Sequence, residues 1–348
     1  EQTPLIHAAG EGHLDVVHML LADPRVDANA RDENQWIALT AAASAGHVHI
    51  MRALLADSRF DPNAPDKWQN TPLIYAAGKG HLDVMQVLLA DSRVDINLEN
   101  GVRRTPLAIA ALEGHVQVVR ALLADLRVDP NALDKWQKTP LLIAAWLGHL
   151  DVVHALLSDL RVDANARDED QWTPLTLAAL NGKVDVVRAL LADPRVDPNA
   201  CDRWEQTPLI HAAGEGHLDV VQALLADPRF DPNARSEWQH TPLIVAAGNG
   251  HFDVVQVLLA DPRVDINARD EDDRTPLILA QSAGHADVAE ALLADPRLDT
   301  QSPPDPSDIT PKLAAAKGPV DAKPRRLRAA KASLVSSWGA LWKRTDPR

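Results

Sequence analysis

Histidine has the widest chemical reach of the residue types in this chain, because imidazole binds metal ions and exchanges protons near neutral pH. His47 and His49 form one close pair, but no HExxH motif or paired-cysteine ligand set accompanies them, so we expect no metal site. Eight of the 14 histidines instead follow a glycine at one recurring position: His13, His47, His81, His115, His149, His217, His251 and His285. Such regular recurrence, with Lys183 once in the same place, predicts a structural role between helices.

Aspartate is the second candidate for chemistry. Asp193, Arg195 and Asp197 exemplify a DxRxD pattern that recurs along the chain and invites comparison with a calcium loop. The pattern lacks the glycine at loop position six and the glutamate at position twelve that such a loop needs. Stacked copies predict parallel ladders of aspartate and arginine instead, a solvated ion-pair edge that contributes little per pair.

Phosphate loops and catalytic nucleophiles are not indicated either. The GxGH stretches, such as the one from Gly78, end helices rather than follow a strand, and no GxSxG motif is present. Cys201 is the single cysteine and occupies a position that holds Arg31 and Arg235 elsewhere, so we expect no special thiol role. One cysteine excludes an intrachain disulfide and favours a reducing compartment. We predict no catalytic site and no cofactor.

The elements that carry these residues repeat with a fixed period. The stretch TPLIHAAGEGHLDVV occurs from Thr3 and again from Thr207, and the signature TPL recurs every 34 residues. Its positions are Thr3, Thr71, Thr105, Thr139, Thr173, Thr207, Thr241 and Thr275, with Ile37-Ala38-Leu39 in the remaining place. Nine repeats in strict register predict a stacked repeat architecture.

Each repeat reads as two short helices and an arm. In the repeat from Thr207, Thr-Pro starts a helix that Gly216 ends. A second helix follows His217, with apolar residues spaced along one face, and the prolines of DPRFDPNAR then prevent further helix. We expect the helices to fill roughly two-thirds of each repeat and the rest to form an extended arm. A pair this small is stable only when neighbours cover its apolar face.

The pattern TPL..AA..GH..VV..LL......NA resembles the ankyrin repeat across residues 1–299, whereas the W-x2-L-G-x2-Y pattern of the tetratricopeptide repeat is absent. The resemblance implies an all-α repeat fold, an ankyrin solenoid of stacked helix-turn-helix units with extended hairpin arms. The family's histidine after TPL is replaced, by Ile6 and Ile74 for example, so its hydrogen bonds are lost or substituted. The family's turn glycine two residues before TPL is mostly glutamine, as at Gln69 and Gln137.

The resemblance also implies a binding surface, a concave groove lined by arm tips and by the ends of the first helices. At those positions an apolar strip and several tryptophans stand out, and exposed tryptophan is typical of binding hot spots. The predicted partner-binding residues are Trp36, Trp68, Leu112, Trp136, Trp146, Leu147, Trp172, Leu180, Trp204 and Trp238. The alternative is that the tryptophans fold down and brace adjacent arms.

The charge is unevenly distributed along the chain. Residues 301–348 contain ten Lys/Arg and four Asp/Glu, a net charge of +6, which leaves −20 on the preceding residues of a chain whose total is −14. The acidic array is not expected to bind nucleic acid.

Residues 300–323 read as a Pro/Ser/Ala-rich linker with a decayed tenth repeat, and 324–348 as a basic amphipathic segment. That segment has the composition of a helix on an anionic membrane or in a partner's groove; a docked cap and disorder are the alternatives.

The sequence therefore favours a non-catalytic, monomeric scaffold that binds a partner protein. The alternative, from another class, is a regulatory or targeting region of a larger enzyme or membrane-associated protein, because a chain that opens on Glu1 inside a repeat reads as a fragment. No apolar run is long enough for a transmembrane helix, and an intracellular location, cytoplasmic or nuclear, is expected.

Overall fold

The computed structural model describes residues 3–299, so the predictions for 300–323 and 324–348 lie outside the described residues. Among the described residues there are 18 α-helices, two in each repeat, and no β-strand. This confirms the predicted all-α repeat fold. The described chain divides into two compact units, a division that the uniform repeat does not reveal. Unit 1 comprises residues 3–174 and 192–196, and unit 2 comprises 175–191 and 197–299.

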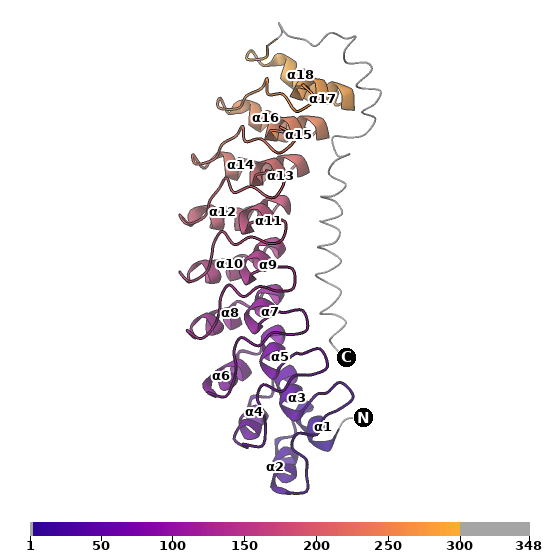
Figure 1. Ribbon diagram of the computed structural model, residues 1–348, viewed down its shortest axis with the longest axis vertical. Helices are drawn as coiled ribbons and strands as arrows, with labels where there is room; N and C mark the ends of the chain where they lie inside the picture. Colours follow the sequence, from indigo (N-terminus) through magenta and orange to yellow (C-terminus); the bar gives the residue numbers. More distant parts are fainter. Residues whose placement is uncertain (1–2, 300–348) are drawn as a thin grey trace. The chain divides into compact units, whose positions relative to one another are not determined.

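Unit 1 contains the helix pairs of the first five repeats. The first helices of successive repeats pack on one another in one row and the second helices in another (Figure 1). The helices are α1 (Pro4–Gly10), α2 (Leu14–Ala22), α3 (Ala38–Ala45), α4 (Val48–Leu55), α5 (Pro72–Lys79), α6 (Leu82–Ala90), α7 (Pro106–Glu113), α8 (Val116–Leu123), α9 (Pro140–Leu147) and α10 (Leu150–Leu157).

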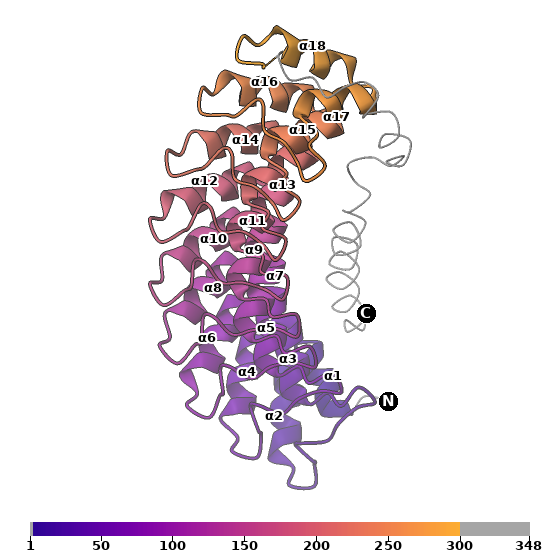
Figure 2. The same ribbon diagram turned by 45° about the horizontal axis from the view of Figure 1, so that its top comes forward.

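Unit 2 contains the later repeats and is built in the same way. In it α13, α15 and α17 pack as one row and α14, α16 and α18 as another (Figure 2). The helices are α11 (Pro174–Leu180), α12 (Val184–Ala192), α13 (Pro208–Glu215), α14 (Leu218–Leu225), α15 (Pro242–Asn249), α16 (Phe252–Ala260), α17 (Pro276–Ala283) and α18 (Ala286–Ala294).

The helix boundaries fall where the sequence predicts them. Thr207 caps α13 by accepting a hydrogen bond from the backbone N–H of Ile210, and Pro208 is the first helical residue. Gly216 ends the helix in the left-handed region, at φ 75°. A residue with a Cβ is disfavoured at this φ, so glycine here makes the sharp turn between the paired helices.

The predicted helix content is wrong, however. Helices α13 and α14 have eight residues each, so about half of that 34-residue repeat is helical rather than two-thirds. The reason is that aspartate side chains fold the stretch after α14 into successive turns. Asp227 accepts from the backbone N–H of Arg229, and Asp231 accepts from that of Asn233. Such side chain–backbone bonds compete with helix formation.

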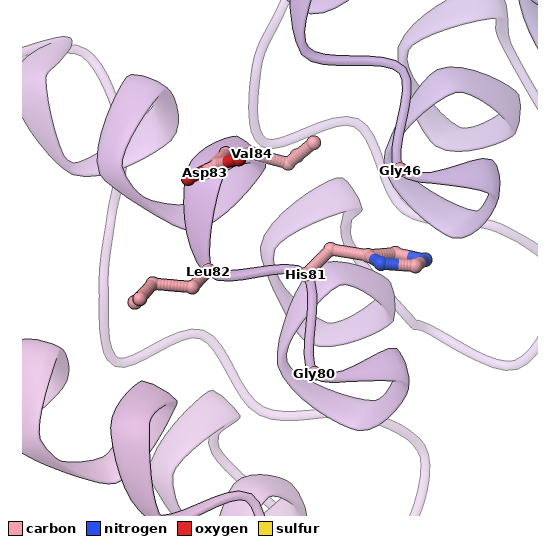
Figure 3. A pocket seen from close by; sticks show the side chains of 6 residues that line it. All are labelled: Gly46, Gly80, His81, Leu82, Asp83 and Val84. Carbon is pink, nitrogen blue, oxygen red and sulfur yellow. The ribbon is translucent and has the colours of Figure 1, made fainter.

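The recurring histidine has the structural role that its regularity predicts. His81 donates from Nε2 to the backbone oxygen of Ser44 in the preceding repeat, at 3.1 Å. Its ring lies against Gly46, where an added Cβ would come within 2.9 Å of the ring (Figure 3). Six histidines repeat this bond, each to a carbonyl 37 residues earlier. The shallow depression of about 310 Å³ beside His81 belongs to this junction between repeats.

Candidate interaction surface

From here on, an arm is the six-residue segment that directly precedes the threonine position of the next repeat. Each arm joins two consecutive repeats and carries the number of the repeat that it follows. Arms 1–5, in unit 1, are residues 31–36, 65–70, 99–104, 133–138 and 167–172; arms 6–8, in unit 2, are 201–206, 235–240 and 269–274. In arm 2, the Asp66 carboxylate accepts hydrogen bonds from the backbone N–H groups of Trp68 and Asn70, both at 2.8 Å. The backbone of Asp66 also bonds that of Asn70, which closes the arm into a tight turn.

Backbone hydrogen bonds tie neighbouring arms together. In unit 1 the N–H groups of Lys67, Gly101 and Lys135 donate to the carbonyls of Asn34, Trp68 and Val102 in the preceding arms, at 2.9–3.1 Å. In unit 2 the N–H groups of Glu237 and Glu271 donate to the carbonyls of Trp204 and Trp238. Side chains at the same arm position in adjacent repeats therefore lie on neighbouring, hydrogen-bonded tips.

The tryptophans at the fourth arm position are half-buried: Trp68, Trp136, Trp204 and Trp238. Cations cover part of three rings. Lys67 lies 4.2 Å from the centroid of Trp68, and Arg203 lies 5.4 Å from that of Trp204. The ring of Trp136 is approached by Arg104 at 5.1 Å and by Lys135 at 5.8 Å. These contacts hold the rings at the tips while leaving part of each ring accessible.

Tryptophans at the sixth arm position differ from those at the fourth in their burial and contacts. Trp172 is fully buried there, and Trp36, although half-buried, packs edge-on against Tyr75 with ring centroids 5.0 Å apart. The prediction of an exposed side chain is therefore wrong for Trp172. For Trp36 the ring contact supports the bracing role that the sequence left open.

The predicted apolar strip of the first helices is also covered. Leu112 and Trp146 are 9% and 7% exposed, and Leu180 is fully buried. Among the predicted residues at the ends of first helices, only Leu147 is half-buried. The expected exposure is therefore wrong for Leu112, Trp146 and Leu180. The reason is that neighbouring residues pack closely around a large apolar side chain at the seventh position after threonine.

A row of buried polar groups, absent from the sequence-based prediction, lies beneath the arms. In arms 4 and 5, the second carboxylate oxygen of the aspartate at the second arm position accepts from the sixth-position side chain of the preceding arm, 30 residues earlier. Arg104 Nε donates to Asp134 Oδ2 at 3.2 Å, and Lys138 Nζ donates to Asp168 Oδ2 at 2.5 Å. All four side chains are at most 3% exposed. Burial lowers the pKa of Arg104, and Asp134 opposes that change by favouring the charged form.

The partners at this buried position differ between arms. Where the sixth position is a carboxamide, at Asn70 and Gln206, the residue 30 positions later is Asn100 or Ser236 instead of aspartate. Asn100 then donates through Nδ2 to Asn70 Oδ1 at 3.2 Å. Asp66 and Asp202 receive their partners from the helices, Tyr75 Oη at 2.6 Å and His211 Nε2 at 2.9 Å. Burial and the bond to Asp66 raise the pKa of Tyr75.

The DxRxD pattern does more than form the predicted exposed ladders. Asp159 and Arg161 pair within one turn, at 2.6 Å between Arg161 Nη2 and Asp159 Oδ2. The same Nη2 donates at 2.8 Å to the carbonyl of Leu123, at the end of the second helix of the preceding repeat. Bonds of this kind, 38 residues apart, join every pair of adjacent repeats, from Arg59 with Leu21 to Arg297 with Leu259. The motif is therefore a clamp between repeats.

Within residues 3–299, no three His, Cys, Asp or Glu side chains gather in a way that would hold a metal ion. None of the helices described there is long and apolar enough to cross a membrane.

Comparison with known proteins identifies the class. A family model for ankyrin repeats (three copies) matches residues 5–100, 89–168, 160–236 and 228–302. The matches span most of the chain, which therefore belongs to the ankyrin-repeat family. Ankyrin repeats are generally non-catalytic modules for protein–protein interaction. No match was found among curated protein sequences.

Proposed function

We propose that this chain is a non-catalytic scaffold that binds a partner protein through its arm tips. In unit 1 the proposed surface, called the arm surface below, consists of the half-buried residues Trp68, Trp136 and Leu147. In unit 2, Trp204 and Trp238 occupy the equivalent tips. Leu112, Trp146, Trp172 and Leu180 are buried and are not part of the proposed surface.

The observation that carries the proposal is the half-exposed tryptophan repeated on hydrogen-bonded tips. Arms 2 and 4 present Trp68 and Trp136, while arm 3 between them bonds to both neighbours through Gly101 and Val102. A rigid backbone that presents large, partly exposed aromatic rings lowers the entropy lost on binding and supplies apolar area. Aromatic side chains are enriched where partner proteins dock.

A competing surface exists on the loops after α8 and α10. Leu126 and Leu160 are 84% and 85% exposed, in the position that proline or serine occupies in other repeats. Single exposed leucines are common on protein surfaces, and an aliphatic side chain cannot make the cation–ring contacts that hold the arm tryptophans. They provide a control surface of similar hydrophobicity in the same unit.

Quantitative affinity capture from a cell extract tests the proposal. Bait chains would be the wild type, Trp68→Ala with Trp136→Ala, and Leu126→Ala with Leu160→Ala. The proposal expects specific partners to be lost with the tryptophan variant and retained with the leucine variant. Retention by the tryptophan variant together with loss by the leucine variant would place the interaction on the loops instead.

A further inference from the structure

Repeat nine, residues 275–299, has an apolar face that is more exposed than the same face of earlier repeats within the described part of the chain. Leu243 and Ile244 of repeat eight are at most 1% exposed, whereas the equivalent Leu277 and Ile278 are half-buried. Leu293 on α18 is 56% exposed. A helix pair in such an array needs a neighbour on each side to bury its apolar residues.

The same end of the chain is also strongly acidic. Residues 270–299 contain eight Asp/Glu and two Lys/Arg, a net charge of −6. Glu271, Asp272 and Asp273 of arm 8 are all exposed, as is Glu290 on α18. Arg274 pairs with Asp270 and Asp272, at 2.8 and 3.1 Å, and therefore offsets only part of this negative charge. By contrast, arms 2, 3 and 4 carry the exposed cations Lys67, Arg103 and Lys135 at their tips.

The sequence that follows repeat nine has the complementary properties. Residues 324–348 contain seven Lys/Arg and one Asp/Glu, a net charge of +6 that equals the opposite charge of 270–299. Their apolar residues fall on one face when spaced as a helix: Leu327, Leu334, Val335, Trp338, Leu341 and Trp342. The 24 residues 300–323, rich in proline and serine, separate this segment from repeat nine and are long enough for it to return.

We propose that the segment 325–344 docks in cis on repeat nine, with its apolar residues against Leu277, Ile278 and Leu293 and its basic residues toward arm 8. Docking removes the apolar face of the last repeat from water and pairs two opposite charges of equal size. Because opposite charges contribute to it, the docking weakens as ionic strength rises.

Amide hydrogen exchange on the full chain tests this proposal. The test variant is Glu271→Lys with Glu290→Lys, and the matched control is Glu11→Lys with Glu169→Lys, which changes the net charge equally at exposed positions of unit 1. A third variant, Trp338→Ser with Trp342→Ser, removes apolar contacts of the segment without changing its charge. Docking predicts that the first and third variants speed exchange in α17 and α18 about tenfold relative to wild type and control. Equal exchange in all four chains overturns it.

Zero-length cross-linking between amines and carboxylates distinguishes the occupants. Cis docking predicts cross-links of Lys331 or Lys343 to residues 270–299 within one chain, at a yield that falls with added salt. Cross-links formed only between isotopically distinct chains would show that a second copy docks instead. Binding of the full chain to vesicles of anionic lipid, with no such cross-link in their absence, would assign the segment to a membrane. Either result overturns the proposal.

Discussion

At the scale of single residues, the arm tip is the feature that departs most from ordinary backbone geometry. Eight non-glycine residues within 3–299 have positive φ: Gln35, Gln69, Arg103, Gln137, Gln171, Glu205, Gln239 and Asp273, at 58–65°. All lie at the fifth arm position, where the family's pattern has glycine. A left-handed conformation costs a residue with a Cβ about 1–2 kcal/mol. Each arm therefore retains strain that its turn and interarm bonds must offset.

Gln69→Gly tests this strain directly, because Gln69 is exposed and its φ is 65°. The relief of left-handed strain exceeds the entropy that glycine loses on folding, about 0.5–1 kcal/mol, so a net gain of about 0.5 kcal/mol in unfolding free energy is expected. Gln69→Ala keeps the Cβ and should give no gain. Urea unfolding of the three chains measures the difference, and a glycine variant less stable than the alanine variant would contradict it.

The buried pairs beneath the arms are the other residue-scale feature. Removing Arg104 leaves Asp134 as an uncompensated buried carboxylate, so Arg104→Gln should cost about 3–5 kcal/mol of unfolding free energy. Adding Asp134→Ser recreates the neutral combination found at Gln206 and Ser236, and should recover most of the loss. A double-mutant cycle by denaturant unfolding measures the coupling. Additive losses would show that the two side chains do not act as a pair.

At the scale of elements, the clamp formed by the DxRxD motif joins one repeat to the next. Arg161 bonds both to Asp159 and to the end of helix α8, so Arg161→Ala should lower the unfolding free energy by about 1–2 kcal/mol. Arg25 provides a matched control, because its side chain is 88% exposed and its described bonds go to Asp23 alone. Arg25→Ala should change stability by less than about 0.5 kcal/mol. Equal losses in the two variants would refute the clamp.

The clamp also predicts how stability changes in acid. Hydrogen bonds from Arg161 hold the pKa of the Asp159 carboxyl below its usual value, and the equivalent aspartates of the other repeats are affected in the same way. A carboxyl with a lowered folded-state pKa stabilises the fold above its unfolded pKa of about 3.9 and loses that contribution as pH falls below it. Unfolding free energy should therefore decrease between about pH 5 and pH 3.

Asp159→Asn isolates one contribution to this acid sensitivity. The variant should be less stable than wild type at pH 6, and the difference should shrink as the pH approaches 3, because wild type then loses the same interaction. Thermal unfolding across this pH range provides the measurement. A difference that stays constant or grows toward low pH would mean that the carboxylate charge of Asp159 does not stabilise the clamp.

The sequence predicts the elements well because their determinants are local. Thr207, Pro208 and Gly216 fix the ends of α13 through capping and backbone geometry, and a 34-residue period repeats the result.

The surface is harder to predict because exposure depends on neighbouring repeats. Trp68 and Trp172 look alike in sequence, yet the fourth arm position faces outward and the sixth faces inward. The 30-residue pairing of Arg104 with Asp134 is visible in the sequence, but only once an arm-to-arm register is known.

At the scale of the whole molecule, sequence differences between repeats divide the roles along the chain. The positions shared by most repeats form caps, histidine junctions and clamps. The variable arm positions carry cations in arms 2–4 and carboxylates in arm 8. An array built from nearly uniform repeats can thus present chemically distinct surfaces on the same backbone frame. The proposed partner site and the proposed docking site for residues 325–344 occupy such differing stretches.

The most direct test of the central claim is the dissociation constant of a captured partner, measured by titration against purified full-length chains. Trp68→Ala is the decisive variant, because its ring is half-buried at an arm tip and contacts the exposed Lys67. The arm surface predicts a loss of about 1–2 kcal/mol in binding free energy, roughly a tenfold rise in Kd, with a nearly unchanged melting temperature. Leu126→Ala with Leu160→Ala should leave Kd unchanged. An unaltered Kd for Trp68→Ala beside a raised Kd for the leucine variant would contradict the account.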